Sequence, residues 1–226
     1  MIDLKDLGTF ESVPEIVVDI VKGNIVALEN ALADGWDIHK PIQLGKHSEY
    51  SPLELALVMN CLPSVQWLVE HEANLNEKEN PSFLLAVRYG NKELIDYIVA
   101  KGANIHALNR VKVDAFQAAL YGKKYENLQQ IHDLGHTVQK YGGKAFRNAI
   151  TDNNYKVLDF FVHSGVDINY NKPDSVYPFK PTPLCVAARY VDLQMCKYLV
   201  EHGADVTITE KDGMRPYSIA IEKGDM

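Results

Sequence analysis

The chain has 226 residues, of which 46% are hydrophobic and 23% charged, and its formal net charge is −7. This composition is typical of a water-soluble globular protein, and its acidic balance disfavours a nucleic-acid partner because the molecule as a whole repels phosphate. No apolar run reaches the roughly eighteen residues of a membrane span, and the segment after Met1 lacks the basic and apolar parts of a secretory signal.

A short sequence motif, which reads Gly-Ala-Asp-Val at 203–206, recurs along the chain from about residue 14 onward, and we call it the refrain. Its turn glycine, or the substitute for it, stands at positions 35, 72, 102, 135, 165 and 203. The intervals between these positions are 37, 30, 33, 30 and 38 residues. A unit that repeats at such a period indicates a stacked array, whose function must be sought on its surface.

Between two refrains the apolar pattern is that of two short helices. Residues 84–90 end a first helix at Gly90, and 92–101 restart with an apolar stripe at 94, 95, 98 and 99. The refrain glycine suits the left-handed backbone that often follows a helix. Each unit is therefore predicted to be two antiparallel helices and a turn. Unrelated helical hairpins are the weaker interpretation, because twelve residues separate the helix break from the refrain both in 23–35 and in 90–102.

A single helix pair cannot bury its own apolar stripe, whereas stacked pairs can. Close stacking needs small side chains where adjacent first helices meet. The sequence places an alanine at that point of five units: Ala56, Ala86, Ala118, Ala149 and Ala187.

Two stretches carry a more specific phrase, Thr-Pro-Leu-Cys-Val-Ala-Ala-Arg-Tyr at 182–190 and Ser-Pro-Leu-Glu-Leu-Ala-Leu at 51–57. Each is followed by the refrain, and in this combination the chain resembles the ankyrin-repeat family over about residues 14–226. The resemblance implies an all-α fold, an ankyrin-repeat solenoid of stacked helix-turn-helix units joined by hairpin-like turns. The organisation expected is a lead-in over 1–13 and an array over 14–226, with units at about 14–39, 46–79, 80–109, 110–139, 142–171 and 182–209 and a partial unit at 211–226.

The chain departs from the family pattern in several places. Glu72 replaces a turn glycine, and the units over 113–138 and 144–169 lack the Thr-Pro-Leu-His phrase, so local irregularity is expected there. Residues 215–224 read as the first helix of a seventh unit without its second helix. We therefore expect the natural chain to continue past 226, or the exposed end to be covered by a partner or a second copy. Otherwise the protein is expected to be a monomer.

No pattern in the sequence indicates catalytic residues, a metal site or a cofactor, so an enzyme is not expected. His132 and His136 have the spacing of a helical metal pair, but Gly135 interrupts the helix between them. Histidines near the ends of second helices are expected to face solvent. Residues 141–144, Tyr-Gly-Gly-Lys, are interpreted as a turn between units and not as a phosphate loop. Three cysteines, an odd number, argue against a disulfide framework and favour a cytoplasmic location.

The resemblance also implies where a partner protein binds, because such arrays use a concave face made by the hairpin tips and the exposed side of each first helix. The groove places are then Met59, Tyr89, Tyr121, Asp152 and Tyr190, and the tips include His47, Tyr50, Lys78, Asn80, Lys112, Tyr141, Tyr177 and Phe179. Tyrosine, arginine and methionine are enriched at interfaces, although Tyr89 and Tyr190 are alternatively packing residues. The partner-binding residues expected are Tyr50, Met59, Arg88, Tyr89, Tyr121, Tyr177, Phe179, Arg189 and Tyr190.

Other features bear on binding. The connection 170–181 holds three prolines beside Tyr177 and Phe179 and is interpreted as a stiffened binding finger. Residues 110–147 are basic within an acidic chain, and are either a solvated face or a dock for an acidic protein segment. Trp67 is expected in the core, and Trp36 half exposed.

The leading hypothesis is a non-catalytic protein–protein interaction module, a scaffold that binds a partner through its concave face. The alternative is an inhibitory or immunity-type protein that neutralises a toxin or an enzyme by occlusion. The sequence itself does not name the partner.

Overall fold

The computed structural model describes residues 13–44, 48–77, 79–174 and 177–224. The chain divides into two compact units, Met1–Ile131 and His132–Met226, and each is described by itself. Residues 1–12 of the expected lead-in and the expected tips His47 and Lys78 lie outside the described residues. Within the described ranges, none of the helices combines the length and the apolar character that crossing a bilayer requires.

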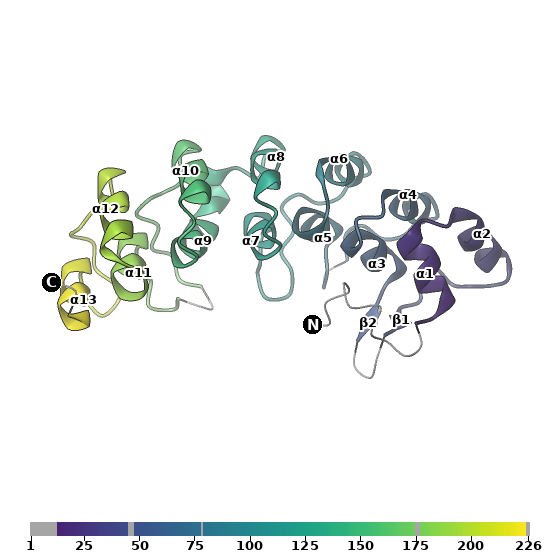
Figure 1. Ribbon diagram of the computed structural model, residues 1–226, viewed down its shortest axis with the longest axis horizontal. Coiled ribbons are helices and arrows are strands. Elements are labelled where there is room, and N and C mark those ends of the chain that lie inside the picture. Colours follow the sequence, from purple (N-terminus) through teal and green to yellow (C-terminus); the bar gives the residue numbers. More distant parts are fainter. Residues whose placement is uncertain (1–12, 45–47, 78, 175–176, 225–226) are drawn as a thin grey trace. The chain divides into compact units, whose positions relative to one another are not determined.

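The first unit consists of short helices in two layers (Figure 1). Helices α1, α3, α5 and α7 pack against one another in order, and α2, α4 and α6 each pack on the helix that precedes them. A small antiparallel ladder pairs Ile42 with Tyr50 and Gln43 with Glu49. The elements are α1 (Glu15–Lys22), α2 (Ile25–Ala33), β1 (Ile42–Gln43), β2 (Glu49–Tyr50), α3 (Pro52–Val58), α4 (Leu62–Glu70), α5 (Ser82–Tyr89), α6 (Lys92–Ala100), α7 (Ala115–Tyr121), a 3-10 turn (Tyr125–Asn127) and α8 (Leu128–Asp133), which ends just past the boundary.

The second unit repeats the same plan. Helix α11 packs between α9 and α13, while α10 packs on α9 and α12 packs on α11 (Figure 1). The elements are α9 (Val138–Thr151), α10 (Tyr155–His163), α11 (Pro183–Tyr190), α12 (Leu193–Glu201) and α13 (Pro216–Lys223). The predicted all-α solenoid plan of stacked helix pairs is thus confirmed within each unit, with the β1–β2 ladder as the one strand pair of the described residues.

Several helices begin where the sequence supplies a side chain that satisfies free backbone N–H groups. Before α3, Ser51 accepts a hydrogen bond from the Glu54 N–H at 3.2 Å, and the Glu54 carboxylate accepts one from the Ser51 N–H at 2.7 Å. Thr182 caps α11 in the same way through the Cys185 N–H, at 3.2 Å. Each such cap contributes about 1 kcal/mol. Four second helices, α2, α6, α10 and α12, begin at a side chain that accepts from the third following N–H, namely Asn24, Asn91, Asn154 and Asp192.

The refrain forms the turn after each second helix and also links neighbouring turns. Its glycines have φ between 79° and 101°, a left-handed backbone that glycine adopts without steric cost. In the first unit the Asn76 side chain accepts from the Asn104 N–H at 2.8 Å and donates to the Gly102 carbonyl at 3.1 Å. In the second, Asn169 accepts from the Asp205 N–H at 2.8 Å. The amide of the refrain therefore connects one repeat to the next.

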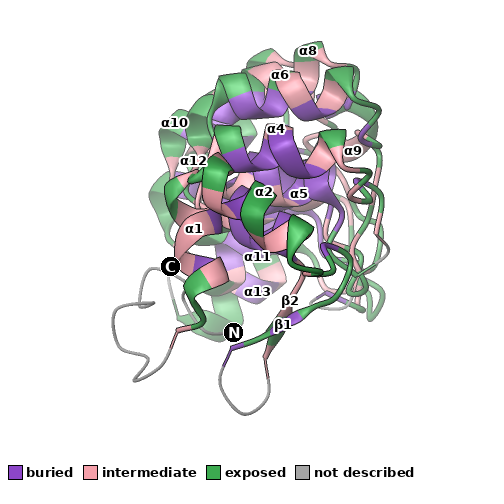
Figure 2. Cartoon of the chain, turned by 90° about the vertical axis from the view of Figure 1, so that its right-hand side faces the viewer, coloured by how far each residue is buried: buried purple, intermediate pink, exposed green. Residues whose placement is uncertain are grey.

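The core lies between the stacked helices of each unit. The five alanines of the first helices are at most 3% exposed, as their predicted role in close stacking requires. Trp67 is buried and Trp36 half-buried, so both predictions are confirmed. Figure 2 shows long buried stretches on α4 and α5 of the first unit. The largest fully buried apolar side chains are Phe83, Phe116, Phe146 and Phe161.

The interpretation of Tyr141–Lys144 as a turn between units is wrong. Helix α9 runs through these residues without a break, and the unit therefore starts at Val138 and not at 142. The two glycines serve packing: a Cβ on Gly143 would lie 2.2 Å from the Tyr170 ring, and one on Gly142 would lie 2.9 Å from the Val138 side chain. These two glycines therefore allow neighbouring side chains to pack closely against α9, and they do not form a turn.

Candidate functional site

The predicted row of binding residues falls at the ends of first helices, as the family pattern implies. Met59 follows α3, while Tyr89, Tyr121 and Tyr190 are the last residues of α5, α7 and α11. Tyr121 and Tyr190 are 49% and 55% exposed, whereas Met59 and Tyr89 are half-buried. Asp152, which follows α9, is exposed as well.

In the first unit the row is partly packed. The Arg88 guanidinium lies 5.1 Å from the centroid of the Tyr89 ring, and Arg88 is half-buried. Tyr50, on β2, is also half-buried; burial raises the pKa of its hydroxyl, and the nearby Glu54 carboxylate raises it further. Tyr121 is therefore the most accessible member of the row in this unit.

In the second unit the structure brings four predicted residues together. The Tyr177 ring contacts Phe179 with their centroids 6.0 Å apart and Tyr190 with their centroids 6.5 Å apart. The Arg189 guanidinium lies 5.7 Å from the centroid of the Phe179 ring. Tyr190 is exposed, Phe179 is half-buried, and the Arg189 side chain is 30% exposed. We call the accessible group of Phe179, Arg189 and Tyr190 the aromatic platform.

Arg189 is held in place by a carboxylate from the next turn. Its guanidinium donates to Glu210 at 2.6 Å, and Glu210 is only 4% exposed. Burial raises the pKa of the Glu210 carboxyl, while the positive charge of Arg189 acts in the opposite direction. The Phe179 carbonyl also accepts a hydrogen bond from the Lys211 N–H at 3.0 Å. The platform therefore has a fixed arrangement before any partner binds.

The platform rests on a buried arginine that the sequence did not indicate. Arg147, on α9, is fully buried and pairs with Asp174 at 2.5 Å and with the Pro181 carbonyl at 3.2 Å. Its guanidinium also lies 4.7 Å from the Tyr170 ring centroid and 5.1 Å from that of Tyr177. One side chain thus fastens the described parts of the 170–181 connection to α9.

Two expectations about this region are corrected. Tyr177 was expected to face a partner, but it is only 8% exposed because it packs between Arg147 and the platform. Arg147 was counted with a basic surface over 110–147, whereas its charge is buried against Asp174. The signal that marks it is its position in the buried register of α9, directly after Phe146 and two residues before Ala149. Of the remaining cations, Lys124 pairs with Glu126 at 3.6 Å, and an acidic partner for this segment stays a prediction.

The histidines have structural contacts. At the ends of α4, α10 and α12, the Nδ1 atoms of His71, His163 and His202 lie 2.7–2.8 Å from the carbonyl oxygen four residues earlier. A carbonyl only accepts, so each Nδ1 carries a proton and helps to close its helix. His136 is an exception to the expected exposure: it is fully buried and stacks on Tyr141, with ring centroids 4.0 Å apart. Among the described residues, no three histidine, cysteine or acidic side chains are grouped as a metal site requires.

The comparisons with known proteins agree with this geometry. A family model described as ankyrin repeats in three copies matches residues 146–226. The ankyrin repeat domain of human ASB11 has a similar fold, with a TM-score of 0.70 over 92% of both chains at 16% sequence identity. Residues 146–226 thus consist of ankyrin repeats, and the described residues have the ankyrin-repeat fold. Ankyrin repeats are protein-interaction modules, and the helix ends and turns described above are the parts that such a module exposes.

Two curated relatives are similar to part of this chain. The RelA-associated inhibitor of Mus musculus is 37% identical over 111 residues, which are 48% of this chain and 12% of that protein. The ankyrin repeat and SAM domain-containing protein 6 of Rattus norvegicus is 32% identical over 96 residues, 41% of this chain and 10% of that protein. The chain therefore spans only about a tenth of these relatives.

Proposed function

We propose that this ankyrin-repeat chain is a non-catalytic module that binds a partner protein through the concave side of its array, with the aromatic platform as a principal contact. The observation that carries the proposal is that Tyr190 is both exposed and held in a fixed position. Its large ring is 55% exposed, yet it is set against the buried Tyr177 and beside Arg189, which is fixed by Glu210. A rigid aromatic group with a polar tip loses little entropy on binding, as is typical of interface anchors.

The proposal places the protein in the cytoplasm. Within the described residues, no disulfide joins Cys61, Cys185 or Cys196. An odd number of cysteines without a disulfide supports a reducing compartment. Cell fractionation with an antibody against the chain tests this point.

The test of the platform uses two tyrosines of the same unit that are both exposed. A photo-crosslinking residue replaces either Tyr190 or Tyr217, which is 66% exposed on α13. We expect a specific crosslinked partner from position 190 and none from position 217. With that partner identified, Tyr190→Ala and Phe179→Ala should each weaken binding by about 2 kcal/mol in calorimetry, the range of interface anchors. Tyr217→Ala is the matched control and should bind normally.

The same experiment defines what contradicts the proposal. If Tyr190→Ala binds as the unaltered chain does but unfolds at a lower temperature, Tyr190 is a packing residue. If the Tyr217 position crosslinks and the Tyr190 position does not, the contact lies elsewhere in the unit.

Inhibition by occlusion is the second candidate function. It is favoured by the similarity over 111 residues to a protein named RelA-associated inhibitor. An occluding protein should abolish its partner's activity at one chain per partner, and Tyr190→Ala should restore that activity. If the partner keeps its full activity when it is saturated with the chain, inhibition is excluded and scaffolding remains as the proposed function.

A further inference from the structure

The first unit has an exposed turn between the refrain after α6 and the start of α7, formed by residues 108–112, which we call the basic tip. Its apolar side chains Leu108 and Val111 are 46% and 66% exposed. Arg110 and Lys112 are exposed as well. Two of the five exposed large hydrophobic side chains among the described residues of this unit thus lie within one stretch of four residues, beside two cations.

The backbone of the basic tip has a fixed conformation. The Asn109 side chain accepts hydrogen bonds from the N–H groups of Val111 and Val113, at 3.1 and 2.9 Å. The Asn109 carbonyl accepts a further one from the Lys112 N–H at 2.9 Å, which closes the turn. A segment that is ordered before binding loses little conformational entropy when a partner contacts it. The tip can therefore present its exposed side chains without first being ordered.

Lys112 stands where the backbone favours a glycine. Its φ is 63°, in the left-handed region that a side chain disfavours and that the refrain glycines adopt without steric cost. Within the described residues neither Lys112 nor Arg110 forms an ion pair, so a contact inside the fold does not explain the lysine. A strained lysine without a charged partner in the fold accords with a role in binding.

The charges around the tip favour an acidic partner. Residues 97–113 hold the cations Lys101, Arg110 and Lys112 and neither aspartate nor glutamate. Asp114, the next acid along the chain, is only 5% exposed and caps α7. Exposed charges are screened over about 8–10 Å, so a short segment at the tip interacts with these cations more than with the net charge of the whole chain. An anionic bilayer, in contrast, is an extended surface that would also meet the acidic remainder of the chain.

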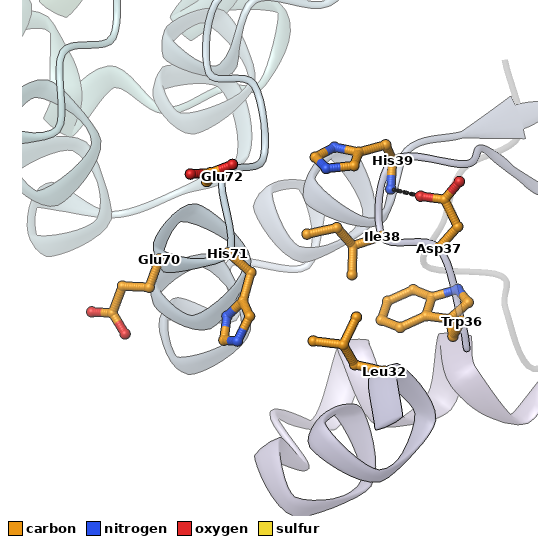
Figure 3. Close-up of a pocket in the computed structure, with 8 residues that line it drawn as sticks. All are labelled: Leu32, Trp36, Asp37, Ile38, His39, Glu70, His71 and Glu72. Carbon is orange, nitrogen blue, oxygen red and sulfur yellow. Dashed lines mark hydrogen bonds between the residues drawn. The ribbon is translucent and has the colours of Figure 1, made fainter. Parts of the chain in front are cut away.

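Another open feature of this unit has no such cations. A hollow of about 410 Å³ lies next to the first two refrain turns, and Trp36 supplies part of its wall (Figure 3). Its charged side chains are the carboxylates of Asp37, Glu70 and Glu72, and Figure 3 shows that of Glu70 turned away from the hollow. Of the described residues that line it, none is a lysine or an arginine. The hollow therefore offers an acidic segment no cation to pair with.

We infer that the basic tip binds an acidic segment of a partner protein in which carboxylates alternate with aliphatic side chains. One carboxylate accepts two parallel hydrogen bonds from the Arg110 guanidinium, another pairs with the Lys112 ammonium, and the aliphatic side chains contact Leu108 and Val111. The inference rests on the proposed function as a partner-binding module and names the chemistry of a second contact. Its test uses no platform residue, so failure of the tip and failure of the platform are separate results.

The probes are three fluorescein-labelled heptapeptides with an amidated C-terminus. The first is Gly-Glu-Leu-Glu-Leu-Glu-Gly, the second has glutamine in place of each glutamate, and the third has serine in place of each leucine. In fluorescence anisotropy we expect saturable binding of the first peptide that weakens as salt is added, and roughly tenfold weaker binding of the other two. The Trp36 ring stacks on Trp67, the other tryptophan of the chain, so tryptophan fluorescence reports on the hollow. It should stay constant when the first peptide is added without its label.

The decisive variant is Lys112→Gly, which removes a charge and relieves the left-handed backbone. It should not lower the melting temperature, yet it should weaken the binding of the first peptide about threefold. Arg110→Gln should weaken binding about fivefold, and the two changes together at least tenfold. Val111→Thr keeps the branched shape and removes a methyl group, and should weaken binding about threefold. Lys22→Gln, at an exposed cation of α1, is the matched control and should leave binding unchanged.

Several results would overturn the inference. Equal binding of the glutamine peptide shows that charge is not recognised, and equal binding of the serine peptide reduces the tip to a general cationic surface. A loss with Lys22→Gln as large as that with Arg110→Gln attributes the effect to net charge. Binding that changes tryptophan fluorescence and survives Arg110→Gln assigns the peptide to the hollow. If no peptide binds, but the chain sediments with vesicles of phosphatidylserine and phosphatidylcholine unless Arg110 and Lys112 are replaced, the tip contacts a membrane and not a protein.

Discussion

Replacing Arg147 by methionine should lower the free energy of unfolding by about 3–5 kcal/mol, the usual loss when one member of a buried ion pair is removed. The reason is the charge that stays behind: the side chain of Asp174 is only 11% exposed, and its partner at 2.5 Å would be gone. The aromatic rings of Tyr170 and Tyr177 would lose their contact with the guanidinium as well. Urea unfolding followed by circular dichroism measures the change.

The double variant Arg147→Met with Asp174→Asn serves as the control. It removes both charges, so it should recover a large part of the lost stability if the penalty comes from an unpaired carboxylate. The single variant should also expose the 170–181 connection, and chymotrypsin should then cleave after Tyr170, which is followed by Asn171, faster than in the unaltered chain. If the single and double variants are equally destabilised, the arginine acts through its packing alone.

The parts of the fold that could be predicted are those that depend on local rules. The refrain glycines, the helix caps and the buried alanines follow from backbone conformation and from the spacing of small residues, and a repeat states each rule several times. Trp67 was assigned to the core because it stands in register with an apolar stripe, and it is 5% exposed. Repetition made these assignments secure where a single copy would have been ambiguous.

The base of the platform could not be predicted because it depends on contacts between segments about thirty residues apart. The register of α9 marks position 147 as buried, but a buried arginine there depends on Asp174 and on two tyrosines that the 170–181 connection brings to it. Gly142 and Gly143 likewise had the pattern of a turn, but the Tyr170 ring fills the space beside Gly143 and the helix continues. Tertiary packing overrides a weak local preference at these sites.

The platform residues were predicted from their position in the repeat, whereas the open hollow lined by Trp36 was not predicted. Tyr190 and Arg189 occupy places that the repeat pattern marks as accessible. Glu72 was recognised as a departure from the refrain and Trp36 as a half-exposed ring, but no local pattern indicates that two residues in different repeats line one hollow.

The second large effect is expected at Gly122, where α7 ends. A Cβ built on this glycine would lie 1.8 Å from the carbonyl oxygen of Arg88, at the end of the neighbouring α5. The obstacle is backbone, so no rotation of a side chain relieves it, and α5 and α7 must separate. Gly122→Ala should therefore lower the free energy of unfolding by about 3 kcal/mol, at the upper end of overpacking effects.

Gly102→Ala separates this steric effect from ordinary backbone strain. Gly102 has φ of 93° and nothing within 4 Å of a built Cβ, so its replacement should cost only about 1–2 kcal/mol through the left-handed conformation. Gly122, by contrast, has an ordinary φ of −80°, so any loss there comes from the contact between the two helices. Urea unfolding of both variants ranks the two effects. A loss at Gly122 no larger than that at Gly102 would mean that the first helices of this unit separate easily, and that their close approach contributes little to its stability.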